Sequence, residues 1–238
     1  MSYRYVSVVR RTRRLAAGAL LSALAVVVLV LALPARGTGS ASPLAYKAAA
    51  SNPFVGLPAT DDIVFLPLDA HARALVHAVV PVVRKWLPPR WVEFTVIPAT
   101  GPTWANKARG GEWNGLTVDN DLLAQFKSAQ GNRQVFIMAV TSQAVYDPGT
   151  PQFGFVFGLL WWHIHKPQFA AIYGTRPMRV FQPQLERSRL TKMMLRYIGQ
   201  IVCDQPRNSN PRSVLYQTIL GTPDLDRMVA TLPAVCRR

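Results

Sequence analysis

The sequence is short of acidic residues. Its 238 residues include 12 aspartates and glutamates against 27 lysines and arginines, and six of the basic residues lie before position 40, where no acid occurs. Residues 40–238 therefore keep 21 basic and 12 acidic residues, a net charge of +9. Such a domain favours anionic neighbours, such as a phospholipid surface or an anionic polymer, although a basic surface also serves solubility alone. Because the basic residues are scattered and no helix-turn-helix or zinc-finger spacing occurs, we expect no nucleic-acid partner.

Several catalytic motifs are also absent. No G-x-S-x-G nucleophile elbow and no glycine-rich phosphate loop occurs, which excludes the hydrolases and nucleotide-binding proteins built on them. Histidine is scarce, with four in the chain. Two of these, His163 and His165, are spaced to share one face of a strand. They are candidates for a metal site only if a third ligand joins them, and they otherwise form a solvent-facing pair.

One long hydrophobic run lies near the N-terminus. Four arginines between positions 10 and 14 precede residues 15–33, a stretch of 19 residues without a charge. About 20 apolar helical residues cross the hydrocarbon core of a membrane, and preceding basic residues stay cytoplasmic. The pattern predicts a cytoplasmic basic N-terminus at residues 1–14, a transmembrane signal anchor at residues 15–33, and a single-pass plasma-membrane protein whose domain lies outside. A cleaved signal peptide, which would leave a secreted protein, is the alternative.

The rest of the chain predicts one extracytoplasmic domain behind a tether. Residues 34–60 are rich in Gly, Ser, Ala and Pro and indicate a linker, which leaves residues 61–238 for the domain. We expect Asp69 to cap the first helix of the domain and Pro81 to end or kink it. Strands are predicted over 62–68, 91–97, 134–140, 153–162 and 170–173, helices over 72–87, 119–130 and 186–202, and a loop over 98–117. This alternation gives an α+β fold class with one mixed sheet.

Cysteine is limited to Cys203 and Cys236. An even number of cysteines in an exported domain favours a disulfide between them. Two separate buried thiols are the alternative, because the sequence alone does not bring two Cα atoms to the separation that a disulfide needs.

Three segments between residues 135 and 228 carry a resemblance to a known family. They read V-F-I-M-A-V-T-S-Q-A-V-Y over 135–146, F-G-F-V-F-G over 153–158, and P-R-S-V-L-Y over 211–216 followed by D-L-D-R-M over 224–228. Their order resembles that of corresponding parts in the archaemetzincin-type zincins, and the resemblance covers about residues 61–236. It implies a zincin-like mixed sheet with a long active-site-type helix at 187–203, which the predicted transmembrane helix would precede.

The zinc motif of that family is missing from this helix. The family's helix carries H-E-x-x-H, in which two histidines bind one zinc ion and the glutamate acts as general base. The corresponding positions hold Arg196, Tyr197 and Gln200, and no histidine follows His165. Arginine does not give up its proton to become a ligand, and a tyrosine hydroxyl does not replace a carboxylate base at neutral pH. The resemblance therefore implies a pseudoenzyme without catalytic zinc, and we expect no other cofactor.

These features together predict a membrane-anchored, non-catalytic zincin-like domain with a binding or structural role at the cell surface. We expect Arg196 to pair with an acid such as Glu186 or Asp204. The membrane, through residues 15–33, and a peptide or anionic cell-surface ligand are the candidate partners, and no oligomeric state follows. The vacated cleft would be lined by Phe155, Phe157, Arg196 and Tyr197. The alternative is a metal-dependent hydrolase or peptidase with a non-standard metal site.

Overall fold

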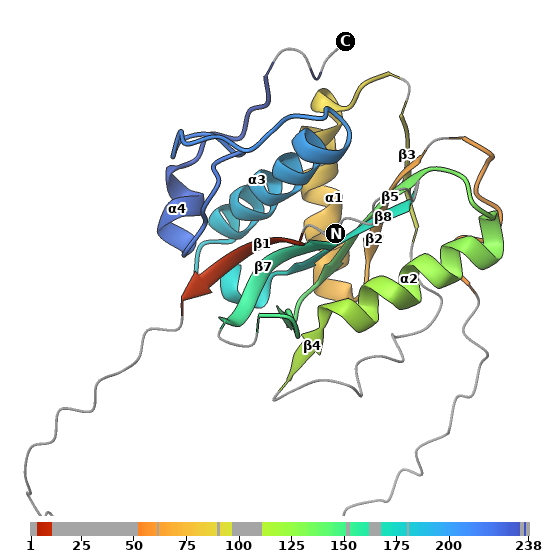
Figure 1. Ribbon diagram of the computed structural model, residues 1–238, viewed down its shortest axis with the longest axis horizontal. Helices are drawn as coiled ribbons and strands as arrows, with labels where there is room; N and C mark the ends of the chain where they lie inside the picture. The colour runs from red at the N-terminus through yellow and green to blue at the C-terminus, as the bar shows by residue number, and fades with distance from the viewer. Residues whose placement is uncertain are drawn as a thin grey trace, which may run out of the picture. The chain divides into compact units, whose positions relative to one another are not determined.

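The computed structural model describes residues 4–10, 52–60, 62–89, 91–96, 111–150, 153–161, 168–179, 181–233 and 236. Within these ranges an eight-stranded mixed sheet forms the centre of the molecule (Figure 1). Seven strands follow the order β3-β2-β5-β8-β7-β6-β4, and β1 pairs with β7. The mixed sheet with helices packed against it agrees with the predicted α+β class.

The middle of the sheet is parallel. Strands β2 (Asp62–Pro67), β5 (Val135–Thr141) and β8 (Gln168–Gly174) run side by side in one direction, with β3 (Val92–Thr95) parallel on the outside of β2. All seven residues of β5 are buried, as expected of a strand covered on both faces. Alternate β5 residues enter two different clusters, with Phe136 and Met138 in one and Val135 and Ile137 in the other.

Three helices cover the two faces of this sheet. Helices α1 (Ala70–Val83) and α3 (Pro183–Ile201) pack together on one face, and α2 (Gly115–Gln130) lies on the other (Figure 1). Asp69 caps α1 as predicted, because its Oδ1 accepts the N–H of Ala72 at 2.8 Å. Pro81 does not end α1, which runs on to Val83 and into the short 3-10 helix η1 (Arg84–Trp86). Pro81 is solvent-exposed, so its helix position does not disturb the core.

Several short elements escaped prediction. The expected loop over 98–117 contains strand β4 (Glu112–Asn114) and the first turns of α2. Strand β6 (Ala144–Tyr146) pairs in parallel with β4, while η3 (Arg176–Met178) and α4 (Thr222–Arg227) follow later in the chain. Three residues are too few to show an alternating hydrophobic pattern, so only pairing with a neighbour defines β4 and β6.

The N-terminal segment corrects the predicted membrane topology. Strand β1 (Arg4–Arg10) pairs antiparallel with β7 (Phe153–Trp161) in the sheet (Figure 1). Two strands of one sheet cannot lie on opposite sides of a membrane, so a single-pass plasma-membrane protein with residues 1–14 cytoplasmic and its domain outside is wrong. None of the helices in the described ranges is both long and apolar enough to cross a membrane. The predicted anchor itself, residues 15–33, and the linker up to residue 51 lie outside the described residues.

The C-terminal segment closes over α3. Cys203, just after α3, is joined by a disulfide to Cys236, with their Cα atoms 5.1 Å apart. Two isolated bridges, Asn208 with Tyr216 and Ser213 with Val229, hold the segment between the two cysteines. Helix α3 therefore lies between the sheet and a second layer of chain.

Candidate functional site

The centre of α3 is buried on all sides. Every residue from 191 to 200 is buried, including polar and charged side chains, because the sheet covers one side of the helix and the C-terminal segment the other. This is the stretch that the resemblance aligns with the zinc motif. What its side chains contact therefore decides what the site can do.

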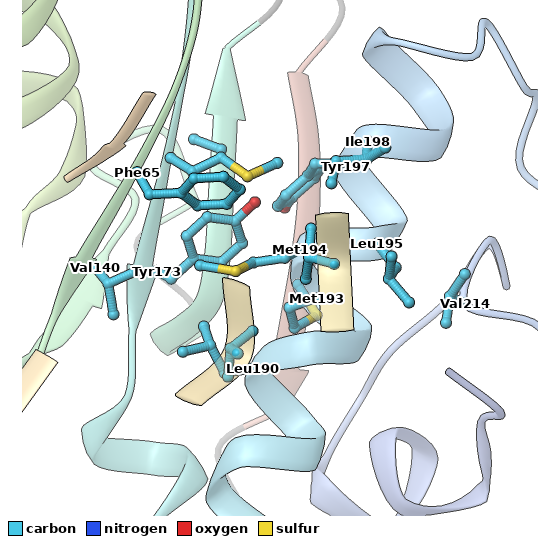
Figure 2. Packing of buried hydrophobic residues seen from close by; sticks show 14 of the residues in the cluster. Phe65, Val140, Tyr173, Leu190, Met193, Met194, Leu195, Tyr197, Ile198 and Val214 are labelled. Carbon is cyan, nitrogen blue, oxygen red and sulfur yellow. The ribbon is translucent and has the colours of Figure 1, made fainter. Parts of the chain in front are cut away.

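Tyr197 stands where the family has its general base, and it points into the sheet. Its hydroxyl donates a hydrogen bond of 2.8 Å to the carbonyl of Gly158 on β7. Its ring lies 5.7 Å from the ring of Tyr173 on β8 (Figure 2), and burial raises the pKa of Tyr173 well above its usual value. A Cβ at position 158 would lie 2.9 Å from Cε2 of Tyr197, so the tyrosine fits only against glycine. The hydroxyl thus serves packing between α3 and the sheet.

Arg196, at the position of the first zinc ligand, faces the C-terminal segment. It is fully buried, and its Nη1 donates to the carbonyl of Val214 at 3.0 Å and to that of Tyr216. Burial, together with the positive charge of Arg207, lowers the pKa of Arg196 to about 10. The guanidinium stays protonated at neutral pH and offers donors only.

The predicted acidic partner of Arg196 is wrong. Glu186 precedes Arg196 by ten residues, which places it about 15 Å away along the helix axis. Its carboxylate contacts His71 and Arg179 instead. Asp204 is exposed beyond the end of α3. Among the described residues no carboxylate forms an ion pair with Arg196. Its guanidinium donates to the backbone carbonyls of Val214 and Tyr216 instead.

Arg196 is the last of three buried cations on one stripe of α3. Arg189, Lys192 and Arg196 are spaced three and four residues apart, so they project from the same side of the helix. Arg189 donates to both carboxylate oxygens of Asp226, at 2.7 and 2.6 Å, and holds the pKa of that carboxyl below its ordinary value. Lys192 donates to the carbonyl of Leu225 at 2.9 Å, and burial lowers its pKa. The stripe therefore anchors the C-terminal segment to the helix.

The residues at the zinc positions do not fit a zinc ion. Arg196 has no lone pair to donate, and the hydroxyl of Tyr197 is bonded to the sheet. Gln200 keeps a buried side-chain amide without a hydrogen-bond partner, but one neutral oxygen does not make a zinc site. Across the described ranges, no group of three His, Cys, Asp or Glu side chains could hold a metal. His163 and His165 lie outside the described residues.

The predicted cleft is filled by its own lining residues. Phe157 is 1% exposed, and Phe155 is half-buried against the same hydrophobic core. Their rings meet edge to face at 5.7 Å. Tyr197 packs with these two rings in the core between β7 and α3, and Arg196 is fully buried on the other side of the helix, against the C-terminal segment.

A pocket of about 310 Å³ lies elsewhere, between the first turns of α1 and α3. Its lining consists of His71, Ala74, Leu75, Arg179, Pro183, Glu186 and Arg187. His71 Nε2 lies 3.1 Å from Glu186 Oε1, and Arg179 Nε lies 3.5 Å from the same oxygen. No sequence motif marks this group as a site, because His71 and Glu186 lie 115 residues apart in the chain.

Comparison with known proteins identifies the fold. No family model and no curated protein matches the chain. Among solved structures, archaemetzincin from Methanopyrus kandleri matches with a TM-score of 0.53 and 17% identity, over 75% of this chain and 92% of that one. Archaemetzincin from Archaeoglobus fulgidus, complexed with malonate, matches with a TM-score of 0.50 and 16% identity, over 74% and 97%.

This chain has an archaemetzincin-like zincin fold. The fold that the sequence resemblance implied is thereby confirmed. The similarity relates the domain to an enzyme fold and, at this identity, extends to the fold alone. Activity has to be argued from the residues on α3 and around it.

Proposed function

We propose that this archaemetzincin-like domain is non-catalytic and acts by binding a partner, an extended peptide or an anionic ligand. The observation that carries the proposal is the use of Arg196 and Tyr197 as core residues. One anchors the C-terminal segment through the carbonyls of Val214 and Tyr216, and the other fixes α3 to β7. Both side chains would have to leave these bonds before a substrate could reach the helix.

The chemistry of zinc hydrolysis sets a requirement that these residues do not meet. A catalytic zinc site needs three protein ligands with free lone pairs, an open position for water, and a carboxylate to take up a proton. Here the first ligand position is a permanent cation and the base position a hydrogen-bonded phenol. A buried cation at this point would also repel a divalent metal ion.

A binding role gains support from the way in which β1 is held. Residues 4–10 add to β7 as an antiparallel strand, although residues 11–51 separate them from the next described part of the chain. Main-chain hydrogen bonds along a sheet edge are a common way to bind an extended peptide. The pairing of β1 supports this edge of β7 as a place where an extended segment can dock, which another peptide could use only by displacing β1.

Metal content and proteolysis of the full chain test the proposal together. We expect less than about 0.1 equivalent of zinc by elemental analysis after dialysis, because the described residues provide no set of zinc ligands. We also expect no cleavage of a quenched fluorescent peptide library and no change in melting temperature on adding EDTA. Stoichiometric zinc together with peptide cleavage would overturn the proposal.

A double variant, His163→Ala with His165→Ala, serves as the matched control. If zinc and peptidase activity are present in the wild type and vanish in this variant, the domain is a hydrolase with a metal site of its own. If both remain in the variant, residues other than His163 and His165 hold the metal. Each of these results refutes a non-catalytic domain, and they differ in where the metal is held.

A further inference from the structure

The pocket between α1 and α3 occupies a favourable place in the fold. Helix α1 follows β2 and helix α3 follows β8, and these strands are parallel, so both helices begin at the carboxyl edge of the sheet. The two helices lie side by side on one face (Figure 1). The crevice outside the carboxyl ends of parallel strands is where open α/β sheets commonly bind ligands. His71 and Glu186, which meet across this pocket, come from the first turns of the two helices.

The charges around the pocket favour an anion. Arg179 and Arg187 bring two positive charges, whereas Glu186, 5% exposed, is the one carboxylate in the lining. Arg179 approaches Glu186 through Nε at 3.5 Å, which leaves its two Nη groups available. Arg187 is exposed and forms no ion pair with the described residues. In addition, Gln182 caps α3 without a side-chain hydrogen bond, so the positive end of the helix dipole adds to the field.

The rest of the pocket is apolar. Ala74, Leu75 and Pro183 contribute to its wall, so a ligand needs a hydrophobic part beside its charge.

We propose that this pocket binds a carboxylate that carries a short apolar body. Arg187 and the Nη groups of Arg179 hold the carboxylate, a planar anion that the guanidinium fork matches. Glu186 contacts both Arg179 and His71 and competes with the ligand for Arg179. The apolar body lies against Leu75. The proposal is independent of the proposed function, because the pocket shares no residue with the zinc positions of α3.

Isothermal titration of the full chain with two matched probes tests the carboxylate requirement. The probes are N-acetyl-leucine and N-acetyl-leucinamide, which share the same apolar body and differ in charge. We expect the acid to bind with an affinity at least about tenfold higher than the amide, and this preference should fall with added salt. Equal binding of the two probes, no binding of either, or tighter binding of inorganic phosphate would overturn the proposal.

Single variants then test the residues. Arg187→Gln should weaken binding of N-acetyl-leucine at least about fivefold, whereas Arg212→Gln, which removes an exposed arginine from the C-terminal segment, should change it less than about twofold. Glu186→Gln should strengthen binding, because it removes the carboxylate that competes for Arg179. A purely structural role for Glu186 would give the opposite sign. Equal effects of the two arginine variants, or weaker binding by Glu186→Gln with an unchanged melting temperature, would refute the proposal.

A third probe distinguishes two sources of the carboxylate. Acetyl-Ala-Ala-Leu with a free carboxylate presents the end of a peptide chain. If it binds at least about tenfold tighter than N-acetyl-leucine, the pocket takes a peptide C-terminus, and equal affinities indicate a small free acid. Both outcomes support a carboxylate site. Zinc content, which tests the proposed function, does not enter these measurements, so the two proposals fail separately.

Discussion

Replacement of Arg196 is the sharpest test of the α3 packing. Two variants separate the polar and apolar contributions of the side chain. Arg196→Met removes the charge and keeps most of the length, and Arg196→Ala removes the aliphatic part as well. The wild-type side chain is fully buried and donates to the carbonyls of Val214 and Tyr216. Burial lowers its pKa to about 10.

The hydrogen bonds of Arg196 and the cost of burying its charge largely offset each other. Two hydrogen bonds from a charged donor contribute roughly 1.5–3 kcal/mol each. The lowered pKa of Arg196 corresponds to a cost of about 3 kcal/mol for holding the charge. The pKa of Arg196 is lower in the folded state than in the unfolded chain. The cost of holding its charge is therefore present in full below pH about 10, and it decreases as the pH rises from there toward the pKa of the unfolded chain. At pH 7 the polar groups of Arg196 therefore stabilise the fold by about 1 kcal/mol.

The aliphatic stem then sets the difference between the variants. Its three methylenes contribute about 2.4 kcal/mol of buried apolar surface. We expect Arg196→Met to lower the free energy of unfolding by about 1 kcal/mol and Arg196→Ala by about 3 kcal/mol. The latter corresponds to a fall in melting temperature of about 6–12 °C.

Urea unfolding at pH 7, followed by tryptophan fluorescence, measures both values. Tyr197→Phe, which removes one buried hydrogen bond next to Arg196, is a suitable control at about 1 kcal/mol. A change below about 0.5 kcal/mol for Arg196→Ala would show that the side chain does not support the core. A larger loss for methionine than for alanine would refute the cancellation of the polar terms.

Three further predictions concern the contacts around α3. Gly158→Ala places a Cβ 2.9 Å from Cε2 of Tyr197 and should cost about 1–3 kcal/mol in urea unfolding, and an unchanged midpoint would show that the tyrosine can move aside. Asp226→Asn removes the acceptor of Arg189 and should cost about 1–2 kcal/mol at neutral pH. Because the pKa of Asp226 is lowered from 3.8, the wild type should lose this stability as the pH falls through the lowered pKa, and melting curves from neutral to acid pH should show no such loss in the variant. Cys236→Ser opens a disulfide that spans 33 residues and should cost about 3–4 kcal/mol, and retention of the wild-type urea midpoint would contradict this.

Hydrophobic patterning predicted the long strands and helices, because a long element has enough buried residues for its hydrophobic pattern to be visible in the sequence. The continuous apolar run at 135–141 is a strand covered on both faces, and the long pattern after residue 183 is the helix α3. The sequence also predicted Asp69 as the N-cap of α1, because capping is an interaction between residues only three positions apart in the chain. The N-terminal hydrophobic run led to a wrong membrane topology. Its length and its flanking arginines are typical of a membrane span, but they carry no information on the pairing of residues 4–10 with β7.

The sequence by itself determined the long strands and helices, the resemblance to the archaemetzincins, and the chemical unfitness of Arg196 and Tyr197 for zinc. These follow from residue type and from spacing along the chain. Only the tertiary structure decided what those residues do instead. Backbone carbonyls of Val214 and Tyr216 accept hydrogen bonds from Nη1 of Arg196, and a carbonyl carries no signature in a sequence because every residue has one. The pocket that joins His71 to Glu186 likewise exists only because two parallel strands deliver their helices to the same edge of the sheet.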